Sequence, residues 1–283
     1  MNINYHIETL KKSAKKKGKG FDHPITNSLI DEYERLDTSQ AMEDYITTGD
    51  LSTYVNRINE YDKFIYEYAR KGQASNPVST RQNKNLSTWR EVIWTPIWER
   101  LKNQLQGKTE LSLVTIQNKK VLQNIFSTGD MKFKDVDGGI GIQDKEDKKL
   151  IRPLLIVEDK GGHADSTAMD GVQGQALQFS LSFPKSIFLF ITDNNFSVGK
   201  HKNKTMYQNV NGVICERGEN LKNVKGYNPV DHVKIQTVID KVTTHFTSEA
   251  IDECWKNVIE IPAINSSGPI RKDIDQKGYY FNF

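Results

Sequence analysis

Three charged residues, Asp137, Glu158 and Lys160, carry the clearest chemical signal in the sequence. Asp137 stands before two glycines, whereas Glu158 and Lys160 follow an apolar run at residues 151–157. Such a run, rich in β-branched residues and leucine, is typical of a strand buried on both faces. Charges at the end of a core strand are costly unless they are paired or bind a metal. Two carboxylates and a lysine around one point would suit a hard divalent cation and phosphodiester hydrolysis.

The segment before this run predicts the strand that brings the aspartate close. Its apolar positions are Phe133, Val136, Ile140 and Ile142. Gly138 and Gly139 allow a backbone or a ligand to approach closely. If the two strands pair antiparallel, Asp137 and Glu158 converge at one edge of the sheet. Because side chains alternate along a strand, Lys160 then shares the face of Glu158, and Asp159 points to the opposite face.

The order D-G-G, charged spacer, apolar strand and E-x-K resembles the PD-(D/E)xK nuclease superfamily, and within it the EcoRI-like type II restriction endonucleases. The resemblance covers residues 133–196. It includes a helix-like stretch at residues 168–183 and a strand-like stretch at residues 186–192. Two positions depart from the family pattern: Val136 replaces the proline of the motif, and Asp159 adds a second acidic residue.

The resemblance implies an α/β fold with a central mixed β-sheet flanked by helices, that is, a restriction-endonuclease-like core. It also implies sequence-specific cleavage of double-stranded DNA that depends on one or two Mg²⁺ ions. Asp137, Glu158 and Lys160 would be the catalytic residues, with Asp137 and Glu158 as metal ligands. Glu91 is the candidate for a further acidic ligand, with Glu99 second; alternatively, Glu91 only favours a helix N-terminus. A palindromic site would imply a homodimer, and restriction would imply a cognate DNA methyltransferase.

The chain divides into four predicted regions. They are a basic flexible arm at residues 1–20, an N-terminal helical region at 21–86, the nuclease core at 87–196, and a loop-rich DNA-recognition insertion with a C-terminal helix at 197–283, in the same domain as the core. Residues 11–20 hold six lysines. They would track DNA phosphates or form a solvated tail, because blocks of like charge resist folding. In the insertion, Lys200, Lys202 and Lys204 are the candidate DNA-binding residues, and a mobile surface loop is the alternative.

Hydrophobic periodicity predicts the elements outside the motif. Helices are expected within residues 24–70 with a break at 47–50, from Ser87 onward, at 119–126 and at 233–255, and strands at 111–116 and 211–216. After the break at residues 47–50, the aromatic residues Tyr54, Tyr61, Phe64 and Tyr68 are predicted to be core residues rather than DNA-stacking ones.

Composition sets limits on the class of protein. The net charge of +3 does not by itself indicate nucleic acid. The sequence has no apolar run long enough for a membrane helix and no secretory signal, which predicts a cytoplasmic protein. Cys215 and Cys254, without CxxC spacing, fit a reducing compartment with free thiols and argue against a structural zinc site.

Three other functions stay open at this stage. The protein could be a non-catalytic DNA-binding protein with a degenerate nuclease site. It could also be a repair or recombination nuclease of the same superfamily. A metal-dependent hydrolase of another substrate is a third reading, but no HxH, HExxH or Ser-His-Asp spacing supports it.

Overall fold

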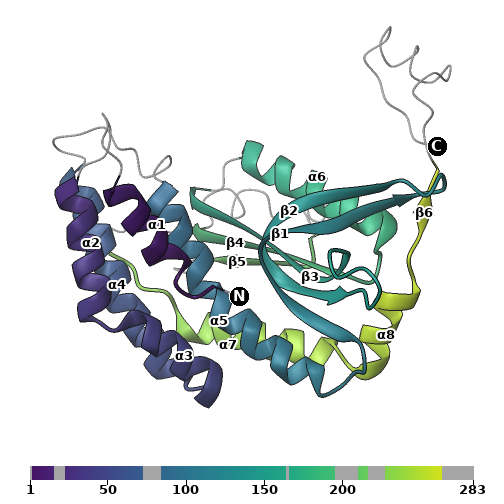
Figure 1. Ribbon diagram of the computed structural model, residues 1–283, viewed down its shortest axis with the longest axis horizontal. Helices are drawn as coiled ribbons and strands as arrows, with labels where there is room; N and C mark the ends of the chain where they lie inside the picture. The colour runs from purple at the N-terminus through teal and green to yellow at the C-terminus, as the bar shows by residue number, and fades with distance from the viewer. Residues whose placement is uncertain are drawn as a thin grey trace, which may run out of the picture.

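The computed structural model describes residues 2–15, 23–72, 84–163, 166–194, 210–215 and 227–262. Its strands are β1 (Ser112–Phe126), β2 (Met131–Gln143), β3 (Ile151–His163), β4 (Ile187–Asn194), β5 (Gly212–Cys215) and β6 (Glu260–Ile261). Its helices are α1 (Tyr5–Ala14), α2 (His23–Arg35), α3 (Thr38–Thr48), α4 (Leu51–Gly72), α5 (Lys84–Gln106), α6 (Ser166–Ser182), α7 (His232–His245) and α8 (Ser248–Lys256). The strands form one six-stranded sheet in the order β5-β4-β3-β2-β1-β6, with helices around it (Figure 1).

The sheet is mixed, so the predicted α/β class with a central mixed sheet is confirmed. β2 pairs antiparallel with β1 and β3, whereas β4 pairs parallel with both β3 and β5. The antiparallel hairpin of β2 and β3 is the one that the sequence predicted. The parallel step from β3 to β4 needs a crossover, and α6 supplies it.

Both faces of the sheet are covered. On one face, α5 packs over β1, β2 and β3, and Trp94 and Trp98 share a buried core with Leu155 and Val157. On the other face, α6 contributes to a second core with Ile156 and with phenylalanines of β4. Alternate residues of β3 therefore enter different cores. This burial explains the apolar run at residues 153–157, where the sequence predicted a strand buried on both faces.

The N-terminal helices share the core of α5. Tyr54 and Tyr61 are buried and Phe64 packs against the same core, which confirms the prediction for these aromatics; the side chain of Tyr68 lies outside the described part. Tyr33 and Tyr45 are buried as well. Figure 1 shows α2, α3 and α4 gathered at the end of the molecule away from the β1–β2 tip.

The predicted flexible arm at residues 1–20 needs correction where the structure describes it. Residues 5–14 form α1, with Ile7 and Leu10 buried, because its apolar face packs on α2 and α5. Lys11 makes an ion pair of 2.6 Å with Glu34. Residues 16–20 lie outside the described residues.

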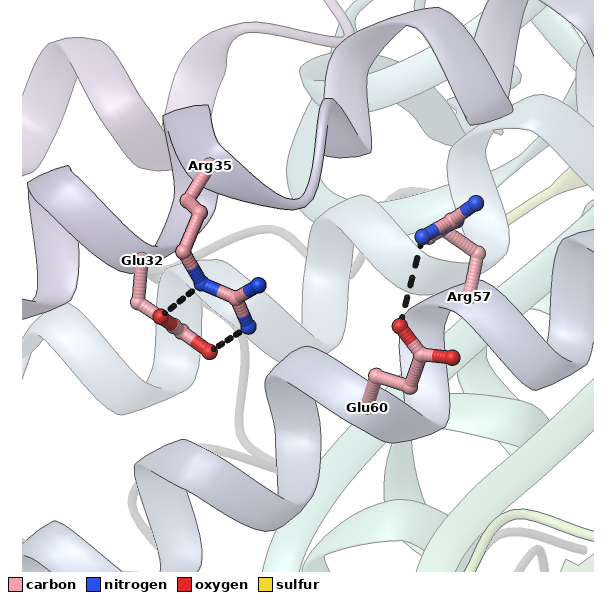
Figure 2. Close-up of polar contacts among 4 residues, drawn as sticks. All are labelled: Glu32, Arg35, Arg57 and Glu60. Atoms are coloured by element: carbon pink, nitrogen blue, oxygen red, sulfur yellow. Dashed lines mark hydrogen bonds and ion pairs between the residues drawn. The ribbon is translucent and has the colours of Figure 1, made fainter.

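Each of α2 and α4 carries an arginine–glutamate ion pair on its outer surface (Figure 2). Arg35 donates through Nε and Nη2 to both carboxylate oxygens of Glu32, at 2.7 and 2.6 Å. Hydrogen bonding from Arg35 lowers the pKa of the Glu32 carboxyl. Arg57 reaches Glu60 at 3.3 Å. Exposed pairs of this kind add little stability, but they neutralise this surface locally.

Three element boundaries differ from the sequence prediction. Residues 119–126 continue β1 instead of forming a helix, because they pair with β2 over residues 131–136. α5 begins at Lys84 rather than at Ser87. The predicted helix at 233–255 is two helices, since Thr247 accepts a hydrogen bond from Ala250 N and starts α8.

The expected short strand at 211–216 is confirmed as β5. None of the helices in the described ranges is long and apolar enough to cross a membrane. Cys254 is a free, buried thiol, and burial raises its pKa to about 12.

The two glycines after Asp137 are required by close approaches within the fold. A Cβ at Gly138 would lie 3.1 Å from Nε1 of Trp98, and one at Gly139 would collide with the carbonyl oxygen of Leu155. Gly139 also has φ of 133°, which side-chain-bearing residues rarely adopt.

Gly139→Ala is therefore expected to lower the free energy of unfolding by about 3 kcal/mol, because the backbone clash adds to the conformational strain. Urea denaturation would measure it. Gly129→Ala is the matched control, since Gly129 has φ of 85° but open space around it, and strain alone costs about 1–2 kcal/mol. Equal losses in both variants would show that the contact with Leu155 is unimportant.

Candidate active site

Asp137 on β2 and the Glu158-Asp159-Lys160 segment on β3 lie side by side. Gly138 pairs with Val157, so Asp137 and Glu158 occupy the next position of the same antiparallel ladder. The backbone N–H of Asp159 donates to Oδ2 of Asp137 at 2.9 Å. This hydrogen bond holds the Asp137 carboxylate against the E-D-K segment, as the sequence predicted from antiparallel pairing.

Glu158 is a buried carboxylate, with 5% of its surface exposed. It pairs with Phe190 of the parallel neighbour β4, and Phe190 belongs to the core that α6 covers. Glu158 therefore lies on the α6 face of the sheet. Lys160 is two residues further on β3 and pairs with Thr192. By alternation along the strand, Lys160 occupies a position on the same face as Glu158. Its side chain lies outside the described part of the structure.

Asp159 points to the other face, as predicted. Arg90 of α5 donates to its Oδ1 from Nη2 at 2.7 Å and from Nε at 3.1 Å. Both side chains are nearly buried, with 9% and 7% of their surfaces exposed. The additional acidic residue in this E-x-K motif thus anchors β3 to α5.

The two candidates for a further acidic ligand lie in different surroundings. Glu99 accepts hydrogen bonds from Lys102 at 2.6 Å and Thr115 at 2.5 Å. Burial raises the pKa of the Glu99 carboxyl, but these two partners outweigh burial and lower the pKa overall. Glu99 therefore has a structural role between α5 and β1.

Glu91 contacts a residue of β1 that lies opposite Asp137. Nδ2 of Asn118 donates to its Oε2 at 2.7 Å. Asn118 stands between two β1 residues whose partners are Gly138 and Val136, so it faces Asp137 across the ladder. No acidic residue lies in the first turn of α5, so the alternative that Glu91 favours the helix N-terminus loses its basis. Its role as a metal ligand stays a prediction.

Asn118 is a residue that the sequence analysis missed. It has φ of 47° in the middle of a long strand. Non-glycine residues in this left-handed region are uncommon, and asparagine is among the few that tolerate it. Its local signal is weak because nothing in the sequence marks residue 118 as the neighbour of Asp137.

The donor set suits a small, hard cation that keeps most of its water. Among the described residues, no three Asp, Glu, His or Cys side chains gather into a metal-binding group. Asp137 and Glu158 offer two carboxylates at neighbouring positions. Mg²⁺ is commonly held by one or two carboxylates together with waters and substrate phosphate oxygens, which is compatible with this pair.

The remaining predicted site residues cannot be placed. Lys200, Lys202 and Lys204 all lie outside the described residues.

Comparison with known proteins adds little to the geometry. No family model matches the chain, and no curated protein matches it. Among solved structures, the chain is similar to a chain of the native BbvCI A2B2 tetramer, with 14% sequence identity and a TM-score of 0.49. The match covers 87% of this chain and 95% of that chain. A similarity of this size assigns neither a family nor a function.

Proposed function

We propose that the protein is a Mg²⁺-dependent endodeoxyribonuclease that cleaves double-stranded DNA at a specific short site, in the manner of a type II restriction endonuclease. The observation that carries the proposal is the hydrogen bond from the Asp159 backbone to the Asp137 carboxylate. It brings the aspartate of the D-G-G segment to the E-x-K segment. The mixed sheet and the α6 crossover agree with the core that the sequence resemblance implies.

In this proposal Asp137 and Glu158 hold the metal, which when bound polarises the scissile phosphate and lowers the pKa of a water molecule. The Asp159 N–H orients the Asp137 carboxylate and needs no side chain to do so. The buried position of Glu158 limits the water around its carboxylate, which strengthens its interaction with a cation. Lys160 is assigned to orient the attacking water and to offset the negative charge that develops on the phosphate.

Two further parts of the proposal follow from the class of enzyme. A duplex site with twofold symmetry would be read by a homodimer. A restriction enzyme would also require a cognate DNA methyltransferase, which protects the same site in the host.

The first test is digestion of plasmid and phage DNA by the wild-type protein. Discrete fragments are expected with Mg²⁺ and none with EDTA, whereas Ca²⁺ should support binding without turnover, because catalysis depends on the geometry of the bound ion. Agarose gels and end-sequencing of the fragments would measure this. A smear would point to a repair or recombination nuclease. Intact DNA with every divalent metal, from folded protein, would contradict the catalytic proposal, and DNA binding without cleavage would favour a binding protein with a degenerate site.

A further inference from the structure

The β1–β2 pair continues beyond the active site as a two-stranded ribbon. β3 pairs with β2 only from Gly138 onward, whereas β1 pairs with β2 down to Met131. Residues 119–126 and 131–136 therefore form an extension that begins at the site and ends in a turn (Figure 1). In the described part of the chain, the β2 edge of this extension has no neighbouring strand.

The ribbon carries more positive than negative charge. Residues 118–136 contain four lysines and two aspartates. Lys119, Lys120 and Lys132 are exposed and Lys134 is half-buried. None of the four makes an ion pair with an acidic residue in the described ranges; Nζ of Lys119 lies 3.5 Å from the carbonyl oxygen of Thr115.

Three of these lysines lack an acidic residue opposite them. Lys120 pairs with Asp135, whereas Lys119 pairs with Val136, Lys134 with Val121 and Lys132 with Asn124. Lys119 and Lys134 are diagonal neighbours on one face, and such positions lie about 7–8 Å apart. Two like charges at this separation repel each other unless an anion lies near them.

This arrangement differs from the charged surface of α2 and α4. On α2 and α4, Arg35 and Arg57 are paired with Glu32 and Glu60, as Figure 2 shows. On the ribbon the lysines are left available to a ligand. Phe133 and Met131 are 42% and 50% exposed, and because they alternate with Lys132 and Lys134 along β2 they face the opposite side of the ribbon.

The spacing of the lysines matches the spacing of phosphates next to a cleavage site. Lys132 is five residues from Asp137 along β2, about 17 Å in an extended strand. One strand of B-DNA carries a phosphate about every 3.4 Å of helix axis, so this length spans about five nucleotides. A two-stranded ribbon is also narrow enough to lie along a DNA groove.

We propose that this ribbon is a DNA-backbone contact, in which Lys119, Lys132 and Lys134 bind phosphates of the duplex beside the scissile phosphate. The inference rests on the proposed nuclease function and adds a surface to it. The contact is independent of base sequence, because lysines bind phosphates as point charges.

The test measures binding of a fluorescein-labelled duplex of random sequence by anisotropy, in Ca²⁺ and over a series of salt concentrations. The variant carries Lys119→Gln, Lys132→Gln and Lys134→Gln. Each lost phosphate contact removes about 0.9 from the slope of log K against log salt, so the slope is expected to fall by about 2–3. Affinity should fall at least about 10-fold, because counterion release supplies most non-specific affinity.

A matched control lies at the opposite end of β2. Lys145→Gln, Lys148→Gln and Lys149→Gln remove the same charge from exposed residues of the β2–β3 turn, and should leave the slope near that of the wild type. Lys119→Arg, Lys132→Arg and Lys134→Arg together should keep the wild-type slope, which separates loss of charge from loss of fold.

The outcomes separate this inference from the proposed function. If the wild type cleaves DNA and the ribbon variant keeps the wild-type slope, the ribbon inference is wrong and the nuclease stands. An equal fall of the salt slope in the ribbon variant and in the control variant would also overturn the ribbon inference, because the loss would then follow from the lower net charge of the protein. A wild type that neither binds nor cleaves duplex DNA would overturn both.

Discussion

Asp137→Asn should reduce the rate of DNA cleavage at least about 10³-fold and leave the fold intact. Loss of a metal-binding carboxylate removes several kcal/mol of transition-state stabilisation, and each 1.36 kcal/mol corresponds to about tenfold in rate. The amide oxygen of asparagine can still accept the hydrogen bond from Asp159 N. Removing one of two neighbouring carboxylate charges also relieves repulsion, so the melting temperature should be unchanged or slightly higher.

Single-turnover cleavage of a plasmid at saturating enzyme would measure the loss. Thermal melting with and without Mg²⁺ gives a second readout, because an ion that binds only the folded state raises its stability. The wild type should show this rise, and Asp137→Asn and Glu158→Gln should lose it. Asp135→Asn is the matched control, since Asp135 is exposed, lies two residues away on β2 and faces Lys120. If Asp137→Asn cleaved DNA at the wild-type rate, Asp137 would not be a catalytic residue.

Arg90→Ala should be among the most destabilising single changes in the molecule, at about 3–5 kcal/mol. Arg90 makes two hydrogen bonds to Asp159, and truncating it leaves a carboxylate buried between α5 and β3. Breaking one half of a buried ion pair costs far more than the pair itself contributes. The double variant Arg90→Met with Asp159→Leu should recover much of the loss, because it removes both charges and keeps the apolar volume.

Urea denaturation of Arg90→Met, of Asp159→Leu and of the double variant gives the coupling energy. Arg57→Ala is the control, because its pair with Glu60 is exposed and should leave the denaturation midpoint nearly unchanged. Additive losses at Arg90 and Asp159 would show that the two residues do not act as a pair. Asp159→Asn should still show the Mg²⁺-dependent rise in melting temperature that Glu158→Gln loses. That contrast would assign metal binding to the first carboxylate of the motif.

The local sequence pattern was sufficient to predict the secondary-structure elements that build the candidate site. Residues 151–157 are apolar except for Arg152, which predicts a strand with both faces covered, and β3 enters both cores. Alternation along that strand placed Glu158 and Asp159 on opposite faces before any partner was known. The helix and strand that follow were expected from the family resemblance and from the aromatic and β-branched content of residues 186–192, and they are α6 and β4.

The sequence pattern predicted the wrong secondary structure where a segment's conformation depends on the segment that packs against it. Residues 119–126 can be read as a short helix, but their pairing with β2 makes them strand. The basic N-terminal segment reads as a flexible arm, yet residues 5–14 are a helix because Ile7 and Leu10 find a buried surface on the rest of the fold. Such contacts override weak local preferences.

The sequence by itself determined the candidate residues, the strand that carries Glu158 and Lys160, and the alternation that separates Asp159 from them. Only the tertiary structure decided which atoms meet. The bond from Asp159 N to Asp137 depends on the β2–β3 register, and the Arg90–Asp159 pair joins residues 69 positions apart. The Glu91–Asn118 contact depends on how α5 lies along β1. Register and helix placement are set by packing of the whole core, and no local stretch of sequence encodes them.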